Sequence, residues 1–536
     1  MLRLGFRGRL VYSGQVFGGR PGGIMAVARK IASVVAAAVI SACTVAATTG
    51  TATASPWAEP GDSTLRNDIH ILENFRLIDG VLNAWPLPWA QITYRLAKAD
   101  RDALPPYAQA ALDRVRARAA AETRQGQLHA ELRADLTNQP ALVRGFDYTA
   151  RQRGEITASF EYMGDSTALR LSVGAYSRFV KGDSPWYYAG EDSFQPSLDG
   201  TYLAQRVDNW ILYAGWLDQW WGPGETTSLI LSTNARPFPK AGFMRSNPHA
   251  FETPWLSWIG PWQLTGFLGV LPDDRVNSNT LMFGLRASVN PIPGLELGAS
   301  RIMMFCGSGR PCGFRTFIDG FFGNTNVNAA QQAQDPANQI AGFDARYSAQ
   351  LFGQPFEVYG ELTGEDAAYS DIGIPLPSRN AAVLGASVWN GWGDDGAVWK
   401  VNVEYSNSTA NFLNDKIYSY FYESGAYPDG YRFYRRAMGD SLDGDAELFG
   451  VTGTFVDSDN WTYKAAYYHA YLNPTNNPRN TVTQSKENIN IVDLGVSIPM
   501  RRNSVGINLR LQDDSPNSPG EQKPMAALGV STTIRF

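Results

Sequence analysis

The feature that most constrains this chain is a period-two alternation of apolar and polar residues that recurs from residue 126 to the C-terminus. Between Val398 and Ser406, one set of alternate positions holds Trp399, Val401, Val403 and Tyr405, and the other holds Lys400, Asn402, Glu404 and Ser406. Alternate side chains of a strand point to opposite faces, so one face suits lipid and the other suits water. The same pattern occurs in 156–162, 281–289 and 505–511. Its repetition predicts a transmembrane β-barrel.

The last alternating segment ends the protein on an aromatic residue. Its apolar face carries Leu528, Val530, Thr532, Ile534 and Phe536. A terminal phenylalanine in phase with the apolar face is typical of bacterial outer-membrane barrels. We therefore expect the barrel assembly machinery to recognise Phe536, and we expect lipid of the outer membrane to surround the strands.

Connection lengths predict the topology, because outer-membrane barrels have short periplasmic turns and long outer loops. Eighteen antiparallel strands are expected, near 126–136, 154–163, 167–177, 200–207, 210–218, 252–259, 262–271, 280–289, 295–305, 340–351, 355–364, 381–391, 397–407, 447–456, 461–471, 490–499, 504–512 and 526–536. Every connection after an even-numbered strand is short. The connections after odd-numbered strands include 178–199, 219–251, 306–339 and 408–446. Both ends of the barrel are then periplasmic.

The composition agrees with an amphipathic barrel. The 536 residues are 18% charged with a formal net charge of −5, which argues against disorder and against nucleic-acid binding. Apart from one segment near the N-terminus, no apolar run reaches the roughly 18 residues that a helical membrane span needs. The chain holds 15 Trp, 24 Tyr, 26 Phe and 52 Gly residues. Aromatic girdles and tight turns account for these numbers.

The exceptional apolar segment predicts a secretory signal at residues 1–54. Arg29 and Lys30 precede an apolar, Ala-rich stretch at 31–47, and Ala52-Thr53-Ala54 offers a small-residue cleavage site. The residues before Met25 fit an export signal poorly, so Met25 is an alternative start. A lipoprotein signal ending at Cys43 is a second interpretation, although the preceding residues match it less well.

Residues 55–123 have a helical rather than a strand period, and the barrel is expected at 124–536. Asp62 and Ser63 are positioned to cap a helix that ends at Gly80. Its apolar face carries Leu65, Ile69, Leu72 and Ile78. A second helix is expected from Pro88, and a third after Pro105-Pro106. The segment has few large apolar residues, so we expect a short periplasmic helical bundle that leans on the barrel.

Two cysteines remain after signal cleavage. Cys306 and Cys312 bracket Gly and Pro residues, and in an oxidising compartment they are expected to form a disulfide that closes an outer loop. With no histidine nearby they make a poor metal site. No metal or other cofactor is expected.

Catalytic motifs are absent from the sequence. The four histidines, His70, His129, His249 and His469, are scattered, and there is no H-E-x-x-H, G-x-S-x-G or Walker A pattern. Paired acids occur at 365–366, 394–395 and 513–514, but sequence does not reveal the separation across a sugar ring that a glycosidase needs. We expect these acids to be solvated and the protein not to be an enzyme.

Aromatic residues cluster in the expected outer loops. A flat apolar face beside hydrogen-bonding groups suits a sugar ring, and arginine adds charge-assisted bonds to uronate carboxylates. The candidate polysaccharide-binding residues are Trp186, Tyr187, Trp220, Trp221, Tyr431, Tyr434 and Arg435. The alternative is that these aromatic residues pack the loops together or lie at the membrane interface. The long loop 219–251 is expected to fold inward, with 229–231 packed against other loops.

Several local motifs resemble the capsule assembly Wzi family. They are Trp220-Trp221-Gly-Pro-Gly224, the stretch from Leu229 to Pro237, the stretch from Phe251 to Trp262, and Leu65-Arg-Asn-Asp68 with Trp85-Pro86. The resemblance runs from about residue 60 to the C-terminus. It implies an eighteen-stranded outer-membrane barrel with a periplasmic helical bundle, acting as a surface lectin that anchors capsular or extracellular polysaccharide. The long leader and the outer loops depart from the family pattern, so the identity of the glycan stays open.

Two other functions are kept as alternatives. Eighteen strands can enclose a water-filled lumen, so the chain is alternatively a diffusion channel for sugars or small solutes. An outer-membrane hydrolase would require turnover that a single acid or serine substitution abolishes.

Overall fold

A computed structural model describes residues 57–126, 128–177, 194–322, 335, 337–369, 375–413, 415–500, 503–518, 520 and 522–536. These residues belong to one compact unit, Thr51–Phe536. The predicted signal at 1–54 and the candidate residues Trp186 and Tyr187 lie outside the described residues. Within the described part of the chain, no helix has the length and apolar character needed to cross a membrane.

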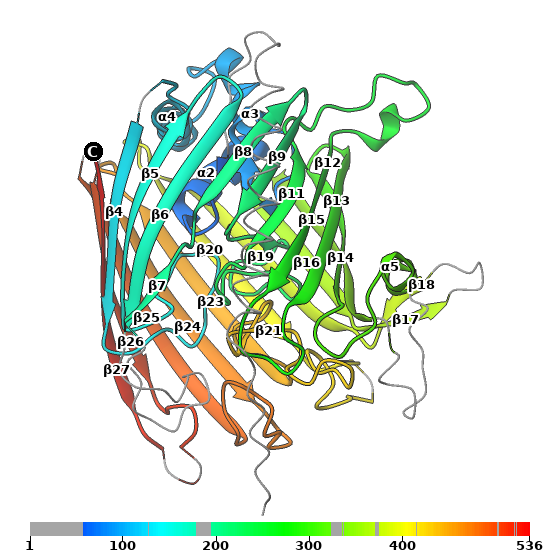
Figure 1. The fold of residues 1–536 in the computed structure, drawn as a ribbon. Coiled ribbons are helices and arrows are strands. Elements are labelled where there is room, and N and C mark those ends of the chain that lie inside the picture. Colours follow the sequence, from blue (N-terminus) through cyan, green and yellow to red (C-terminus); the bar gives the residue numbers. More distant parts are fainter. Residues whose placement is uncertain are drawn as a thin grey trace, which may run out of the picture. The chain divides into compact units, whose positions relative to one another are not determined.

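The described chain forms a closed antiparallel β-barrel (Figure 1). Its strands are β4 (Leu128–Thr137), β5 (Gly154–Met163), β6 (Thr167–Ser177), β7 (Phe194–Ser197), β8 (Tyr202–Val207), β9 (Trp210–Gly215), β11 (Lys240–Arg245), β12 (Trp262–Leu271), β13 (Thr280–Ile292), β14 (Leu295–Phe305), β15 (Ala337–Leu351), β16 (Gln354–Gly364), β19 (Ala381–Trp392), β20 (Ala397–Asn407), β23 (Ala446–Val456), β24 (Thr462–Leu472), β25 (Glu487–Met500), β26 (Asn503–Gln512) and β27 (Met525–Arg535). Both β7 and β8 pair with β6, so they are two parts of one interrupted strand. The predicted fold, a barrel of eighteen strands, is confirmed.

Alternation along each strand produces the two faces of the wall. In β20, Val401 and Val403 are exposed on the outer face, whereas Lys400, Asn402 and Glu404 are buried on the inner face. The direction of every one of these side chains agrees with the predicted period. The inner residues were expected to meet water, and that expectation is wrong for β20, because other parts of the chain fill the lumen beside it.

The first and last strands close the barrel. β27 pairs with β4, and the backbone N–H of Phe536 donates to the carbonyl of Ala130 at 2.9 Å. The ring of Phe536 is 70% exposed. The terminal residue is thus part of the wall, with its ring available at the barrel surface.

The two ends of the barrel differ in their connections. One end carries the turns 164–166, 208–209, 293–294, 352–353, 393–396 and 457–461, and we call it the short-turn end. The other carries the connections 138–153, 216–239, 272–279, 365–380, 408–445, 473–486 and 513–524, and we call it the long-loop end. The C-terminus lies at the short-turn end, as the alternation of lengths predicts (Figure 1).

The sixth strand lies elsewhere than predicted. It is β11, which pairs with β9 and β12, and not the segment 252–259. That segment instead contains the 3₁₀ turn η2 (Ser257–Ile259), because Pro254 and Pro261 lack the backbone N–H that a ladder needs. The connection 246–261 is therefore a long one at the short-turn end, and the predicted strict alternation of lengths is wrong there.

A helical segment, residues 57–122, occupies the short-turn end, and we call it the cap. Its elements are β1 (Trp57–Ala58), α2 (Ser63–Asn74), β2 (Ala84–Trp85), β3 (Leu87–Pro88), α3 (Trp89–Thr93), η1 (Leu96–Lys98) and α4 (Pro106–Glu122). Asp62 caps α2 by accepting from the N–H of Leu65 at 3.0 Å, as expected from the sequence. The helix ends at Asn74, before the predicted stop at Gly80.

The cap packs against the inside of the wall. Its buried apolar residues form one cluster with Trp389, Val398 and Val456 of the barrel, and Tyr107 of α4 lies against Gly391 beside the turn 393–396. The expectation that the segment leans on the barrel is confirmed. A bundle this small gains from the wall the apolar burial that it cannot supply alone.

The connection 216–239 folds into the lumen. Its short strand β10 (Trp220–Trp221) pairs with β2 of the cap. Leu229, Ile230 and Leu231 are at most 3% exposed, and they share a core with inward-facing residues of the wall such as Phe267. The predicted inward folding of this loop is confirmed.

The connection 408–445 covers the first one from the long-loop end. The hydroxyl of Tyr422 donates to the carbonyl of Leu229 at 2.5 Å, and that of Tyr431 donates to the carbonyl of Ile230 at 2.7 Å. We call the two connections, 216–239 and 408–445, the plug. The second holds the short hairpin strands β21 (Arg432–Phe433) and β22 (Arg436–Ala437). Outside the plug, the long-loop end adds β17 (Asp366–Tyr369), β18 (Pro375–Ser378) and helix α5 (Phe314–Phe321).

Carboxylates of the wall hold the plug by its backbone. Glu404 accepts from the N–H groups of Glu225 and Thr227, each at 2.7 Å, and also from that of Thr226. Glu361 accepts from the N–H of Leu229 at 3.2 Å. A buried N–H without a partner is costly, so these acceptors allow an irregular backbone to lie inside the barrel.

Glu404→Ala should therefore loosen the plug. Three N–H groups and the hydroxyl of Tyr359 would lose their acceptor, and each unpaired buried group costs about 1 to 3 kcal/mol. Hydrogen exchange of residues 225–227 in detergent should accelerate, less so in Glu404→Gln, which retains a carbonyl acceptor. Val403→Ala, on the outer face of the same strand, is the control. Unchanged exchange in Glu404→Ala would contradict this role for the carboxylate.

Candidate functional site

The hairpin β21–β22 ends in a strained two-residue turn. Its tip residues, Tyr434 and Arg435, have φ angles of 47° and 60°. A hairpin turn with both central residues at positive φ usually holds Asn-Gly, because a side chain disfavours this backbone by roughly 1 to 2 kcal/mol. Backbone strain of this kind is concentrated at functional sites. Both tip residues are exposed, unlike the four strand residues beside them.

A buried ion cluster holds the base of this hairpin. Nη2 of Arg432 donates to Glu423 at 2.7 Å and to Asp443 at 2.9 Å. Asp443 also accepts from the N–H and the hydroxyl of Thr481, at 2.8 and 2.7 Å. Burial alone would raise the pKa of Asp443, but the guanidinium of Arg432 and these hydrogen bonds outweigh burial and lower it. The charged carboxylate thereby ties the hairpin to the neighbouring loop 473–486.

A second loop holds the tip from the other side. The carboxylate of Asp273 accepts from the N–H of Tyr434 at 3.1 Å, and Asp429 accepts from the N–H of Val276 at 2.8 Å. Arg275 donates to the carbonyls of the hairpin segment, at 3.3 Å to that of Arg432. The sequence predicts loop 272–279 only as a connection between two strands. The approach of Asp273 to the tip depends on contacts far apart in sequence, so no local pattern indicated it.

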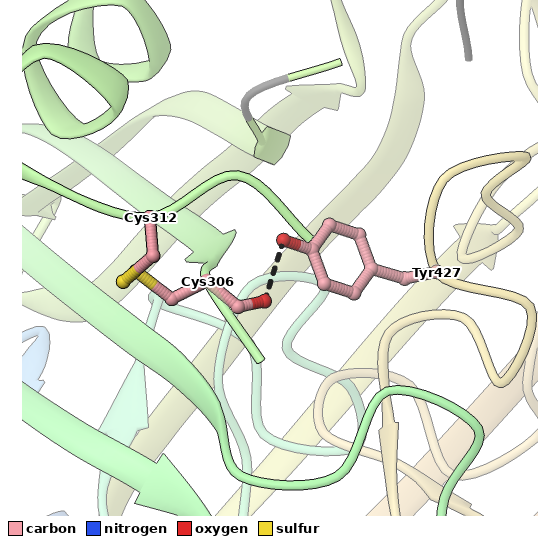
Figure 2. Close-up of a disulfide and its surroundings, with 3 residues drawn as sticks. All are labelled: Cys306, Cys312 and Tyr427. Atoms are coloured by element: carbon pink, nitrogen blue, oxygen red, sulfur yellow. Dashed lines mark hydrogen bonds between the residues drawn. A yellow bond between two sulfur atoms is a disulfide. The ribbon is translucent and has the colours of Figure 1, made fainter. Parts of the chain in front are cut away.

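Cys306 and Cys312 are joined by a disulfide, with their Cα atoms 4.5 Å apart (Figure 2). The hydroxyl of Tyr427 donates to the carbonyl of Cys306 at 3.1 Å. The closed loop therefore contacts the plug at the long-loop end.

The other described candidates are not at the surface. Trp220, Trp221 and Tyr431 are at most 1% exposed. Trp220 packs edge to face on Phe146 with centroids 5.6 Å apart, and Trp221 packs on Phe267 at the same separation. Their faces are occupied by the protein, so stacking of these three rings on a sugar does not fit this structure. The alternative, that such residues pack the loops together, describes them correctly.

Asp440 is a buried acid within the plug. Its backbone N–H donates to the hydroxyl of Tyr422 at 2.8 Å, and its carboxylate accepts from the N–H of Leu442 at 2.8 Å. Burial raises its pKa from an ordinary value of 3.8 to about 7. The state of this carboxyl therefore changes within the physiological pH range.

The histidines lie in unrelated surroundings. His70 is buried in the cap with Nδ1 3.0 Å from Glu357, and burial lowers its pKa to about 3, so the ring is neutral. His249 packs on Tyr94, and His469 bonds with Asn490. Among the residues that the structure describes, no group of three or more His, Cys, Asp or Glu is placed to hold a metal ion. Within this part of the chain, the exposed hairpin tip is the candidate site.

Comparisons with known proteins agree with this architecture. The sequence model of the family described as "Capsule assembly protein Wzi" matches residues 123–514. A Klebsiella pneumoniae protein, described as an uncharacterized 55.8 kDa protein in the cps region, is 29% identical over 477 residues, covering 88% of each chain. A solved structure superposes with a TM-score of 0.74 and 26% identity, over 90% of this chain and 99% of the other. That structure is described as Wzi of Escherichia coli, an outer-membrane, carbohydrate-binding β-barrel involved in group 1 capsule assembly.

The raised pKa of Asp440 predicts pH-dependent loop stability. A group whose pKa is raised on folding contributes stability below its unfolded value, here about 3.8, and loses it as the pH rises through about 7. Local opening of residues 438–445 should therefore increase between these limits, by up to about tenfold per pH unit.

Hydrogen exchange of the wild type relative to Asp440→Asn, measured across the same pH series, checks this expectation. The amide variant cannot ionise at this position, so it retains only the pH dependence of other groups, such as Asp445, whose pKa burial raises to about 6. A constant ratio between the two proteins would show that Asp440 does not titrate in this range.

Proposed function

Because the chain belongs to the capsule assembly protein Wzi family, we propose that it is a non-catalytic lectin of the outer membrane that holds capsular or extracellular polysaccharide at the cell surface. The observation that carries the proposal is the exposed tip Tyr434-Arg435, held in a strained backbone on a buried hairpin. Support also comes from the Escherichia coli relative, which is described as carbohydrate binding.

The chemistry of the tip suits an acidic polysaccharide. An exposed tyrosine ring such as that of Tyr434, whose centroid lies 4.5 Å from that of Phe433, can stack on the C–H face of a sugar ring. A guanidinium such as that of the exposed Arg435 can form paired bonds to a uronate carboxylate. An aromatic stacking contact contributes only about 0.5 to 1.5 kcal/mol, so one site binds one repeat unit weakly. A polymer compensates by engaging many copies of the protein at once.

The proposed orientation places the long-loop end outside the cell and the cap in the periplasm. The short turns at the cap end and the long connections at the other end support it, because outer-membrane barrels follow this rule. Phe536 then lies on the periplasmic side, where we propose that the assembly machinery binds it. The outward belt of the barrel, with residues such as Leu384, Val403 and Val530 exposed, suits the lipid of the outer membrane.

The packed plug is the observation against the channel alternative. A porin needs a continuous aqueous path, whereas here wall residues including Met304, Ile340 and Tyr359 share a buried core with the plug. The cavity of about 1140 Å³ that remains on the side of β4, β5 and β27 is also lined by residues of the cap and of connection 138–153. For the hydrolase alternative, the described residues offer no specific observation in its favour. We therefore retain the lectin as the single proposal.

Replacing the tip side chains tests the lectin proposal. Tyr434→Asn combined with Arg435→Gly removes both side chains and leaves a dipeptide that prefers this turn, so the hairpin should fold at least as well. We expect polysaccharide to move from the cell surface to the medium. Tyr431 is left unchanged, because its hydroxyl holds the plug.

The matched control is Leu413→Ser, which removes an apolar side chain, 77% exposed, from the same connection. This variant should retain wild-type amounts of surface polysaccharide. If the double variant is correctly inserted and also retains wild-type amounts, the hairpin tip is not the glycan site.

Protease-accessible tags test the orientation. A tag inserted beside Asp102, which is exposed in the cap, should be protected on intact cells, and one beside Leu413 should be cut. Gly80 is an unsuitable position because it is buried against Asn290. Permeabilised cells provide the control, since both tags should then be cut. Cleavage on intact cells of the tag at Asp102 alone would show that the orientation is opposite to the proposed one.

A further inference from the structure

Helix α5 lies on the outside of the barrel wall, next to β14 and β15 (Figure 1). By the alternation of its strand, Phe283 points outward from β13, and Phe317 of α5 packs edge to face on its ring with centroids 5.2 Å apart. Met303 and Phe305 point outward from β14, yet they are only 0% and 5% exposed. The helix therefore covers part of the outer face.

The contact between α5 and the wall is close and specific. A Cβ atom on Gly320 would lie 2.6 Å from the sulfur of Met303 and 2.8 Å from the Cβ of Ala337, so only glycine allows this approach. Arg301, which also points outward, donates to the carbonyl of Gly320 at 3.3 Å and lies over the ring of Phe321. The wall thus carries residues fitted to hold the helix in place.

Opposite Phe317, at helical spacing, α5 carries the ion pair of Arg315 and Asp319, and two phenylalanines at its ends are also exposed. Phe314 is 80% exposed and Phe322, directly after the helix, is 56% exposed. Farther along the same outer face, Leu297 and Phe343 are 41% and 49% exposed. In a transmembrane barrel these outward strand positions meet lipid. The exposed rings of α5 therefore extend an apolar surface that is already in contact with acyl chains.

We propose that α5 is a lipid-binding helix that lies at the boundary of the membrane leaflet at the long-loop end. Phe314 and Phe322 enter the acyl chains, and Arg315, which is 95% exposed, remains at the level of the polar headgroups. Exposed aromatic residues at the ends of a helix, with the exposed ion pair of Arg315 and Asp319 between them, suit the boundary between acyl chains and headgroups. The proposal depends on insertion of the barrel in a membrane and not on glycan binding.

The position of α5 in the chain gives the lipid contact a structural consequence. The segment just before the helix is the disulfide loop, in which the carbonyl of Cys306 accepts from Tyr427 of the plug (Figure 2). Arg310 of the same loop lies over the ring of Tyr427, 5.1 Å from its centroid. Residues 306–321 thus connect the proposed lipid contact of α5 with the plug at the long-loop end of the barrel.

Photocrosslinking tests the proposal in intact cells. Phe314 is replaced by p-benzoylphenylalanine in the full chain, and the irradiated peptide is analysed by mass spectrometry. We expect adducts with membrane lipid. The control places the same residue at Leu413, which has similar exposure but lies in the plug connection, and it should give no lipid adduct. Adducts of Phe314 with protein only, which include a second copy of this chain, would overturn the proposal, as would no adduct.

A second measurement does not depend on crosslinking chemistry. Phe314→Ser with Phe322→Ser removes the exposed rings and leaves the wall contacts of Phe317 and Gly320 intact. In lipid nanodiscs, hydrogen exchange should accelerate in α5 and stay unchanged in the barrel strands, because so short a helix is marginal without apolar burial. Equal exchange of α5 in the variant and the wild type would show that lipid does not stabilise the helix through these rings, and would overturn the proposal.

Discussion

The rest of the structure depends on hydrogen bonds from inserted backbone to carboxylates of the barrel wall. The backbone N–H groups of a strand bond to carbonyls of the neighbouring strands, whereas those of the irregular segments inside the lumen need other acceptors. Glu296 accepts from the N–H groups of Leu82 and Asn83 in the cap, as Glu404 and Glu361 do from the plug. A carboxyl group has two oxygens, so one side chain accepts from several backbone N–H groups. Part of the polar inner face, which in an open barrel would meet water, thereby becomes the binding surface for the chain's own loops.

These bonds connect the wall to the candidate site through the two connections of the plug. Glu361 and Glu404 hold connection 216–239, whose carbonyls in turn accept from the hydroxyls of Tyr422 and Tyr431. The same connection 408–445 ends in the hairpin with Tyr434 at its tip. Two non-glycine residues at positive φ keep this strained turn only where the surrounding structure holds them in it. The buried plug supplies that constraint and holds the tip in one position.

The sequence predicted the elements that local periodicity defines and missed those set by distant contacts. Alternation located the strands because the outer face of each is apolar and the inner face polar, and the apolar stretch 229–231 correctly indicated an inward loop. The short strand β11 was missed because its six residues carry too little pattern, while the aromatic stretch 252–259 imitated a strand. Burial of Trp220 and Trp221 was not predictable, because an aromatic residue in a long loop suits a core and a ligand surface equally.

The chain's own cap and plug occupy the part of the lumen beside strands such as β12 and β16, and a cavity of about 1140 Å³ remains beside β4, β5 and β27. Conductance of the purified wild-type protein in a planar bilayer tests most directly whether these inserted segments block the lumen, because an eighteen-stranded barrel without inserted segments would hold a wide aqueous path. We expect no steady conductance above that of the bilayer. Large, stable open steps would show that water and ions pass through the barrel, and would contradict the claim that the inserted segments block this path.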